Sequence, residues 1–238
     1  MSSECERSER RSCSIESLQY SSVTSARILS VNVGVIRRVE WRGAEVSTAI
    51  WKTPVSGRVA LRGVNFAGDD QADRTVHGGP HKAVYAYATE DYDFWRDAEG
   101  MATSPGLFGE NLTVEGLDLS SAIVGERWSV GSTVLEVAQP RLPCYKLGIR
   151  VGDQHFLKRF MIARRLGAYL RVVQEGDVGA GDAVDVIDKP AHGITLRSMT
   201  DALRDGRKGA ALLEVSPLPP FWRRVAEGGE DGDGDEDQ

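Results

Sequence analysis

Long hydrophobic runs are missing from this 238-residue sequence. The first 26 residues contain nine serines and four glutamates, without the apolar run that a secretory signal needs. We therefore expect 1–26 to be a disordered extension rather than a signal or transit peptide. Since no stretch is long and apolar enough to cross a membrane, we expect no membrane association and a cytoplasmic location.

Cysteine is also scarce in this chain. Of the three cysteines, Cys5 and Cys13 lie in the Ser-rich extension, which excludes a disulfide-stapled scaffold and favours a reducing compartment. The four histidines provide no second pair beside His77 and His81 at the spacing of a structural zinc site. Cys144 is thus the one cysteine in the expected folded body.

A strong charge of one sign is absent from the body of the chain. The net charge of -6 comes from the last twelve residues, which carry seven acids and no base. Without them, 29 bases face 28 acids, so the body shows neither a nucleic-acid nor a membrane footprint. We expect 227–238 to be a disordered acidic tail, with a regulatory contact as the alternative.

The apolar residues between 27 and 187 come mainly in short alternating runs broken by glycine. A period of two residues is typical of half-buried strands, and this spacing favours a barrel or sandwich over alternating βαβ units. We therefore predict one mainly β domain over 27–187. Its strands are expected within 27–34, 45–51, 57–63, 82–88, 110–116, 132–139, 168–176 and 182–187.

Two helices are predicted inside this domain. The first, over 89–100, has Thr89 as N-cap, acids in its first turn and Gly100 as its stop. The second, over 153–167, has Asp153 as N-cap and bases toward its end.

A helical segment is predicted to follow the β domain over 188–226. It contains a short helical pair, 198–206 and 219–227, which we expect to pack on the domain through Leu203, Phe221 and Trp222.

The stretch "HGGPHKA", residues 77–83, combines two histidines and a lysine with a Gly-Gly-Pro turn. Because Gly78 and Gly79 lack a Cβ, backbone amides can approach a ligand closely, while His77 and Lys82 supply donors to an anion such as a phosphate. The alternative is a plain hairpin turn with solvated histidines.

Cys144 lies in "QPRLPCYKLG", where Pro143 restricts the chain and Arg141 and Lys146 are close in sequence. Nearby positive charge stabilises a thiolate, which is a soft ligand suited to molybdenum, copper or zinc. One alternative is a buried structural cysteine. Another is a thiol-dependent hydrolase or transferase in which Cys144 is the nucleophile, His77 or His81 the base, and Asn111 the orienting residue.

Several coupled motifs together resemble the MOSC family, the domain related to the C-terminal part of molybdenum cofactor sulfurases. They are "WKTPVSGRVAL", "GDDQADRTVHGGPHKAVYAYATEDYDFW", "FGENLTVEGLD", "VAQPRLPCYKLG", "RRLGAYLRVVQEGDVGAGDAVDV" and "LLEVSPLPPFWRR". Their order and spacing are similar to those of the stand-alone, YiiM-like bacterial branch, and the similarity runs from Arg27 to Val225. The resemblance implies a mainly β, minor α fold: a closed β-barrel with small flanking helices.

The resemblance also implies a function. It makes Cys144 the sulfur ligand of a molybdenum cofactor, a pterin dithiolene that ends in a phosphate. The expected activity is reduction of N-hydroxylated compounds such as hydroxylaminopurines, with electrons from a separate flavin or iron–sulfur reductase. The family's pyridoxal phosphate association belongs to a sulfurase domain, which we do not expect in this chain.

The residues matching the family's motifs are then assigned roles. Besides Cys144, we expect His77 to donate protons and Asn111 to contact the pterin, whereas Asp69 is expected to cap a turn. Other contacts to the cofactor are predicted from Lys52, Gln71, Asp73, Arg74, Gly78, Gly79, Lys82, Arg141 and Lys146.

One rival function stays open within the resemblance. The protein could store the molybdenum cofactor or carry sulfur without any turnover of its own. In either case we expect a monomer or homodimer that binds no nucleic acid.

Overall fold

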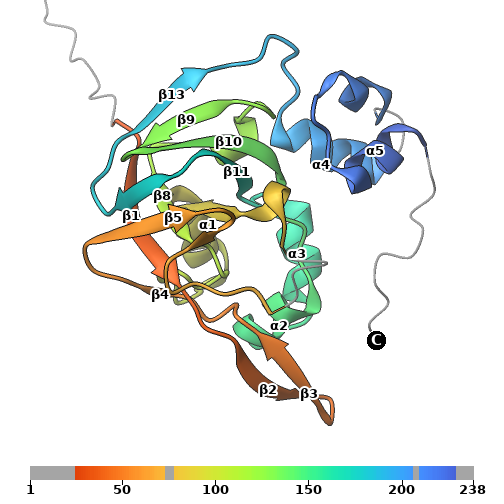
Figure 1. Ribbon diagram of the computed structural model, residues 1–238. Helices are drawn as coiled ribbons and strands as arrows, with labels where there is room; N and C mark the ends of the chain where they lie inside the picture. The colour runs from red at the N-terminus through yellow and green to blue at the C-terminus, as the bar shows by residue number, and fades with distance from the viewer. Residues whose placement is uncertain (1–24, 73–77, 206–208, 229–238) are drawn as a thin grey trace, which may run out of the picture.

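The computed structural model describes residues 25–72, 78–205 and 209–228. The fold is mixed α/β with more strand than helix, and most of the helices lie along one side of the strands (Figure 1). Within these residues, no helix is long and apolar enough to span a membrane.

The central sheet has eight strands. They are β1 (Arg27–Val33), β4 (Thr53–Pro54), β7 (Val84–Ala88), β8 (Leu112–Glu115), β9 (Arg127–Val130), β10 (Thr133–Pro140), β11 (Ala168–Gln174) and β13 (Val184–Asp188). Their order is β13-β9-β10-β11-β7-β8-β1-β4, and β7 and β8 run parallel while the other neighbours are antiparallel. The buried residues of these strands form one wall of the main hydrophobic core.

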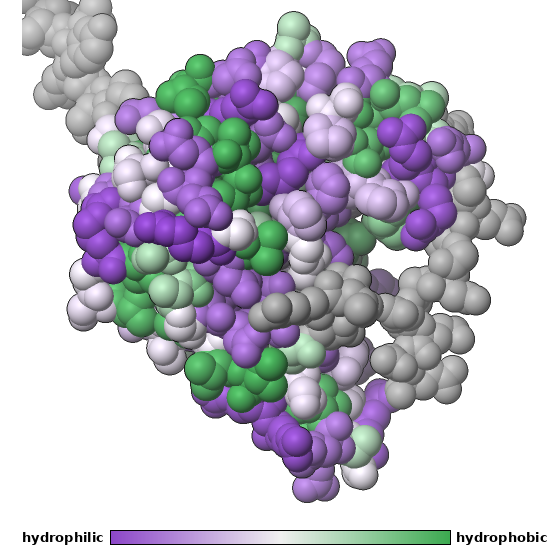
Figure 2. Space-filling model, in the orientation of Figure 1, coloured by the Kyte–Doolittle hydropathy of each residue, from purple (hydrophilic) through white to green (hydrophobic). Residues whose placement is uncertain are grey.

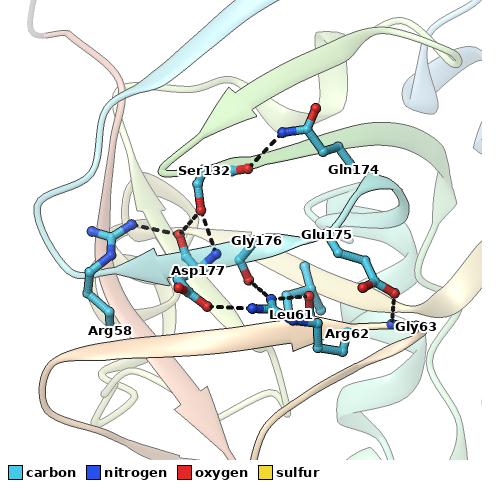
Figure 3. Close-up of polar contacts among 9 residues, drawn as sticks. All are labelled: Arg58, Leu61, Arg62, Gly63, Ser132, Gln174, Glu175, Gly176 and Asp177. Atoms are coloured by element: carbon cyan, nitrogen blue, oxygen red, sulfur yellow. Dashed lines mark hydrogen bonds and ion pairs between the residues drawn. The ribbon is translucent and has the colours of Figure 1, made fainter.

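Two smaller sheets lie beside the central one. β12 (Gly176–Gly179), β5 (Arg58–Arg62) and β6 (Asn65–Phe66) form the first, and the hairpin β2 (Arg37–Trp41) with β3 (Ala44–Thr48) forms the second. Polar contacts join the first to the turn before β10 (Figure 3). There, the Asp177 amide of β12 donates to Ser132 Oγ at 2.8 Å, while Gln174 Nε2, at the end of β11, donates to the Ser132 carbonyl at 3.0 Å. Each predicted strand segment overlaps an observed strand, and β3, β10 and β13 each extend one residue beyond the predicted bounds, whereas β2, β4, β6, β9 and β12 were not predicted.

The prediction of a closed barrel was wrong, because no sheet in the described part of the chain closes on itself. β13 and β4 are the free edges of the central sheet. An isolated bridge between Arg27 and Ala183 brings β1 against the chain that leads into β13. This contact is confined to the start of β1, where the Ile28 amide donates to the Asp182 carbonyl at 2.9 Å and the Val184 amide to the Ala26 carbonyl at 2.8 Å. β4 pairs farther along β1, at Asn32 and Val33, so no ladder joins the two ends of the sheet.

The first predicted helix is confirmed as α1 (Thr89–Glu99). It begins one residue earlier than expected, because Thr89, the predicted N-cap, is already helical and Ala88 occupies the N-cap position. It ends where expected: Gly100 adopts a left-handed φ of 65°, a conformation that glycine accepts without a steric penalty.

The second predicted helix is shorter than expected, and another precedes it. α3 spans Phe156–Ala163, and the Asp153 carboxylate accepts a hydrogen bond from the His155 amide at 2.8 Å just before it. α2 (Tyr145–Val151) begins directly after Cys144 and was not predicted. Three short 3₁₀ helices complete the described elements: η1 (Pro80–Lys82), η2 (Leu119–Ser121) and η3 (Gly209–Glu214).

An aromatic cluster forms a second core between β7, α1 and α3. Its rings are in direct contact, with centroids 4.9 Å apart for Trp95 and Phe156 and 5.0 Å apart for Tyr87 and Phe108. The indole of Trp95 donates to the Tyr87 hydroxyl at 2.8 Å, so a buried polar group of each ring is satisfied. Phe108 belongs to this cluster and also lines a pocket, so the packed rings hold part of the pocket wall in place.

The C-terminal helices α4 (Leu196–Asp205) and α5 (Pro220–Ala226) pack against the central sheet (Figure 1). Trp222 is fully buried, and Leu203 and Phe221 are partly buried against the same core, as the sequence predicted. The Trp222 indole donates to Gln139 Oε1 at 2.7 Å, and Gln139 Nε2 donates to the His81 carbonyl at 3.2 Å. Gln139 therefore links α5 to the loop that carries Lys82.

Replacing Trp222 by Phe should lower the free energy of unfolding by about 1–3 kcal/mol, because Gln139 Oε1 then lacks its buried donor. Urea titration followed by circular dichroism measures the change. Trp41→Phe, on the projecting β2–β3 hairpin, is the matched control and should leave the unfolding midpoint unchanged. Equal stability of the Trp222→Phe variant and wild type would contradict this account of the link.

Candidate functional site

A pocket of about 100 Å³ lies where the chain after β3 meets β7, β11 and the start of α2. Its walls come from segments that are far apart in the sequence. The residues that line it are Thr48, Ala49, Ile50, Lys52, Asp70, Gln71, Ala72, Lys82, Tyr85, Phe108, Gly109, Asn111, Arg141, Cys144, Lys146 and Tyr169.

Cys144 lies at the wall of this pocket, at the N-cap position of α2. Its backbone is extended, and its carbonyl accepts the first helical hydrogen bond from the Leu147 amide at 2.9 Å. The side chain is half-buried, and it forms no disulfide with another described residue. Pro143 and α2 thus position the sulfur from both sides at the edge of the cavity.

Arg141 places a permanent positive charge in the same pocket. Only 5% of the residue is exposed, and its guanidinium stacks on the rings of Tyr85 and Phe160 at 5.5 and 5.8 Å. Burial alone would lower the pKa of Arg141, but its neighbours Tyr85, Cys144 and Tyr169 outweigh burial and raise that pKa. Because Nη1 is buried and has no hydrogen-bond partner among the described residues, this cation is suited to an anionic ligand.

A second buried cation, Lys52, is held by Asp69. Burial lowers the pKa of Lys52, and its ion pair with the Asp69 carboxylate opposes that shift. Asp69 Oδ1 also accepts from the Gly34 amide at 2.8 Å, and Oδ2 accepts from Asn111 Nδ2 at 2.8 Å. Asp69 is therefore more than the turn-capping residue expected from the sequence, since one carboxylate orients two pocket side chains.

The side-chain amide of Asn111 bonds within the protein at both ends. Besides Asp69, Nδ2 donates to the Asn32 carbonyl at 3.3 Å, and Oδ1 accepts from the Tyr85 amide at 3.2 Å. These bonds connect the pocket wall to β1 and β7. The predicted contact of Asn111 with a pterin stays a prediction, whereas its structural bonds were not foreseen.

Glu110 shapes the loop beside Asn111. It is fully buried, and its carboxylate accepts from the Tyr92 hydroxyl at 2.7 Å, the Gly106 amide at 2.6 Å and the Phe108 amide at 3.2 Å. Burial raises the pKa of Glu110, and these hydrogen bonds oppose the rise. Gly109 follows with a φ of 82°, and a Cβ there would come within 2.7 Å of an Ile50 side-chain carbon. The motif "FGEN" thus builds a tight loop that packs under the pocket.

The other predicted site residues fall into three groups. Gln71, Lys82 and Lys146 line the pocket, and Gln71 Oε1 is buried without a hydrogen-bond partner among the described residues. Gly78 and Gly79 are described but do not line the pocket. Gly79 has a φ of 87° and directly precedes η1. The predicted roles of Asp73, Arg74 and His77 concern positions outside the described residues.

The apolar walls were missed at the level of sequence. Ile50, Tyr85, Phe108 and Tyr169 line the pocket together with the polar groups. Tyr85 and Tyr169 lie in strands whose sequences are typical of a buried core. Only the residues that they contact in the folded protein show that they belong to a pocket. The alternation along β7 and β11 predicts which side chains share a face but not that one face ends at a cavity.

His81 lies beside the pocket rather than in its wall. It is half-buried, and its Nδ1 has no hydrogen-bond partner among the described residues. Burial lowers the pKa of His81, the Arg171 cation lowers it further, and Glu136 opposes both. Folding therefore favours the neutral imidazole.

This shift has a defined pH dependence. Because the folded pKa lies below the unfolded value of 6.5, the contribution of His81 to stability is present above that value and is lost as the pH falls through the folded pKa. His81→Gln should therefore flatten the acid-side fall in unfolding free energy. Urea titrations at a series of pH values test this, and parallel slopes for wild type and His81→Gln would refute it.

Known proteins that are similar to this chain show the family to which it belongs. A family model described as "MOSC domain" matches residues 73–185, a range that includes Lys82, Asn111, Arg141, Cys144 and Lys146. The chain is 36% identical over 200 residues to the uncharacterized protein YflK of Bacillus subtilis, covering 82% of this chain and 90% of YflK. This chain therefore belongs to the MOSC domain family.

Within that family the chain is YiiM-like. It is 31% identical over 185 residues to Protein YiiM of Escherichia coli, covering 75% of this chain and 82% of that protein. The crystal structure of YiiM from Geobacillus stearothermophilus superimposes with a TM-score of 0.70 at 26% identity, covering 86% of this chain and all of that one.

A further relative carries a functional name. A protein of Gibberella moniliformis named "Reductase" is 32% identical over 197 residues, which cover 81% of this chain and 35% of that protein. The shared part is thus a minor share of that longer relative.

Proposed function

We propose that this protein binds the molybdenum cofactor in the pocket and reduces N-hydroxylated compounds. The observation that carries the proposal is the convergence of a cysteine and several cations on one cavity. Cys144 is accompanied by the buried Arg141 and Lys52 and by Lys82 and Lys146. The family and the relative named "Reductase" support a redox role over a purely structural one.

The donor set fits the chemistry of this cofactor. Its metal requires a soft anionic ligand, which the Cys144 thiolate supplies, and its phosphate requires fixed positive donors. Arg141 Nη1 and Gln71 Oε1 are buried polar atoms that the described residues leave without hydrogen bonds, so that a ligand with acceptor and donor groups would satisfy both. Lys82 and Lys146 add charge at the same wall.

When bound, the cofactor supplies a two-electron redox centre next to Cys144. The overall reaction is R–NHOH + 2 e⁻ + 2 H⁺ → R–NH₂ + H₂O, with both electrons from a separate reductase. The chain's own residues hold the cofactor and the substrate, exclude water from the pocket and deliver protons. Lys52 lines the pocket and can hold a proton there, while Asp69 keeps its ammonium oriented. His77, the proton donor predicted from the sequence, is proposed to donate protons to the substrate.

The apolar walls favour a flat substrate. Tyr85, Phe108 and Tyr169 present aromatic surface around the polar groups, and such surface suits the ring system of a hydroxylaminopurine. Substrates of this shape are the ones we would screen first.

Molybdenum content is the first test. Wild type and Cys144→Ser are produced in a host that makes the cofactor, and the metal is measured by elemental analysis. We expect about one molybdenum per wild-type chain and its loss in the variant, since a serine hydroxyl is a poor replacement for a soft thiolate. Equal molybdenum in both proteins, or none in either, would refute the proposed ligand.

Turnover separates an enzyme from a cofactor or sulfur carrier. Cofactor-loaded protein is mixed with a reductant and a hydroxylaminopurine, and amine formation is measured. An enzyme forms the amine and loses this activity in Cys144→Ala with an unchanged circular dichroism spectrum, whereas a carrier releases cofactor and forms none. A thiol-dependent hydrolase or transferase would instead act without metal and be inactivated by alkylation.

A further inference from the structure

Three arginine side chains stack on two tryptophans next to the β2–β3 hairpin. The guanidinium carbons of Arg37 and Arg150 lie 5.3 and 5.7 Å from the ring of Trp51, and that of Arg42 lies 5.4 Å from the ring of Trp41. We call these five residues the arginine–tryptophan surface. Arg37, Trp41 and Arg42 belong to the hairpin, whereas Trp51 follows β3 and Arg150 lies in α2.

The carboxylates of the hairpin are on its other face. Alternation along β2 puts Arg37 and Trp41 on one side and Arg38 and Glu40 on the opposite side. Glu45 pairs in register with Glu40, so it shares their side, and it forms an ion pair with Arg38 at 3.1 Å. Among the residues that the structure describes, none of the three arginines of the arginine–tryptophan surface forms an ion pair with a carboxylate.

Arg37 and Arg150 bring two like charges to one ring. Arg150 is half-buried, and its Nε lacks a hydrogen-bond partner in the described part of the chain. Burial lowers the pKa of Arg150, and the Arg37 cation lowers it too, against attraction from Tyr92 and Glu110. An approaching anionic group would relieve this repulsion and gain charge-assisted hydrogen bonds.

This surface is close to the pocket. Trp51 stands between Ile50 and Lys52, which both line the cavity. Arg150 lies six residues after Cys144 on α2, which corresponds to about 9 Å along a helix axis. A molecule bound here would therefore sit on the outer side of the wall that holds the candidate metal ligand.

Exposed apolar residues flank the arginine–tryptophan surface. Val35 is 64% and Ile36 is 42% exposed, directly before β2. The hairpin projects from the body and pairs with no other described strand (Figure 1). Figure 2 shows hydrophilic residues over its lower part and hydrophobic ones gathered near its base. Arginine and tryptophan surrounded by apolar contact area are the residues that protein interfaces favour.

We propose that an acidic electron-donor protein docks on the arginine–tryptophan surface. This inference rests on the proposed function, because a reductase that needs electrons must meet its donor near the pocket. Positive charge that no described carboxylate pairs with selects an acidic partner, and the extent of the surface, from the hairpin turn to α2, fits a protein better than a small anion. Electrostatic attraction would steer the encounter and weaken as salt rises.

The test compares two electron donors on the cofactor-loaded full chain. Reduced flavodoxin, an acidic protein, is the docking probe, and reduced methyl viologen, a small cation, is the donor that needs no docking. We expect Arg37→Gln to lower kcat/KM for flavodoxin about tenfold and to leave the methyl viologen rate unchanged. Arg38→Gln, one residue along on the opposite face, is the matched control and should behave as wild type.

Further measurements keep the outcome clear. Arg42→Asn, at the exposed hairpin turn, should also reduce the rate with flavodoxin. This variant replaces Arg37→Gln in the test if Arg37→Gln proves unstable. Equal flavodoxin rates in wild type and both variants, or an equal loss in Arg38→Gln, would overturn the docking proposal. So would calorimetry in which inorganic phosphate binds at Arg37 and flavodoxin does not bind.

Failure of the proposed function would look different. In that case even methyl viologen drives no amine formation by wild-type protein. Calorimetric titration of the loaded protein with flavodoxin then decides the docking proposal by itself: binding that Arg37→Gln weakens and Arg38→Gln does not supports it, and absence of binding overturns it.

Discussion

The carboxylate of Asp69 and the ammonium of Lys52 are buried together, and neither charge could be kept from water without the other. The cost of burying this pair is offset by what the carboxylate does in addition. It accepts hydrogen bonds from Gly34 and from Asn111, and Asn111 in turn bonds to β1 and to the amide of Tyr85. The pocket wall is thus one connected polar network rather than a set of independent side chains.

The rest of the site is arranged around that network. Glu110 holds the tight loop that carries Phe108, and the aromatic cluster beneath it resists displacement because its rings pack edge to face. Arg141 stacks on Tyr85 from above, so a cation and an aromatic wall share one support. A pocket built this way keeps its charged groups in place before any ligand arrives, which reduces the free energy that ordering would cost on binding.

Positive charge is concentrated in the pocket and on the nearby arginine–tryptophan surface. Buried cations line the cavity, and two further arginines without carboxylate partners in the described chain, the exposed Arg37 and the half-buried Arg150, stack on Trp51 next to Lys52. One set is suited to an anionic cofactor and the other to an acidic protein surface. Positive charge prevails in both sets because the nearby carboxylates either form hydrogen bonds inside the fold, as Glu110 does, or lie on the opposite face of the hairpin, as Glu40 and Glu45 do.

The sequence by itself determined β1, β3, β5, β7, β8, β10, β11 and β13, since a pattern of apolar residues depends on neighbours along the chain. It did not determine β2, β4, β6, β9 or β12. It also determined α1, where Gly100 ends the helix, and singled out Cys144, Arg141 and Lys52 through motifs. It did not reveal that the sheet stays open, because closure depends on whether distant edges such as β4 can pair. Nor did it reveal α2, the bonds of Asn111 or the stacking of Arg37 and Arg150 on Trp51. These were decided by tertiary structure, since each joins segments whose proximity no local pattern encodes.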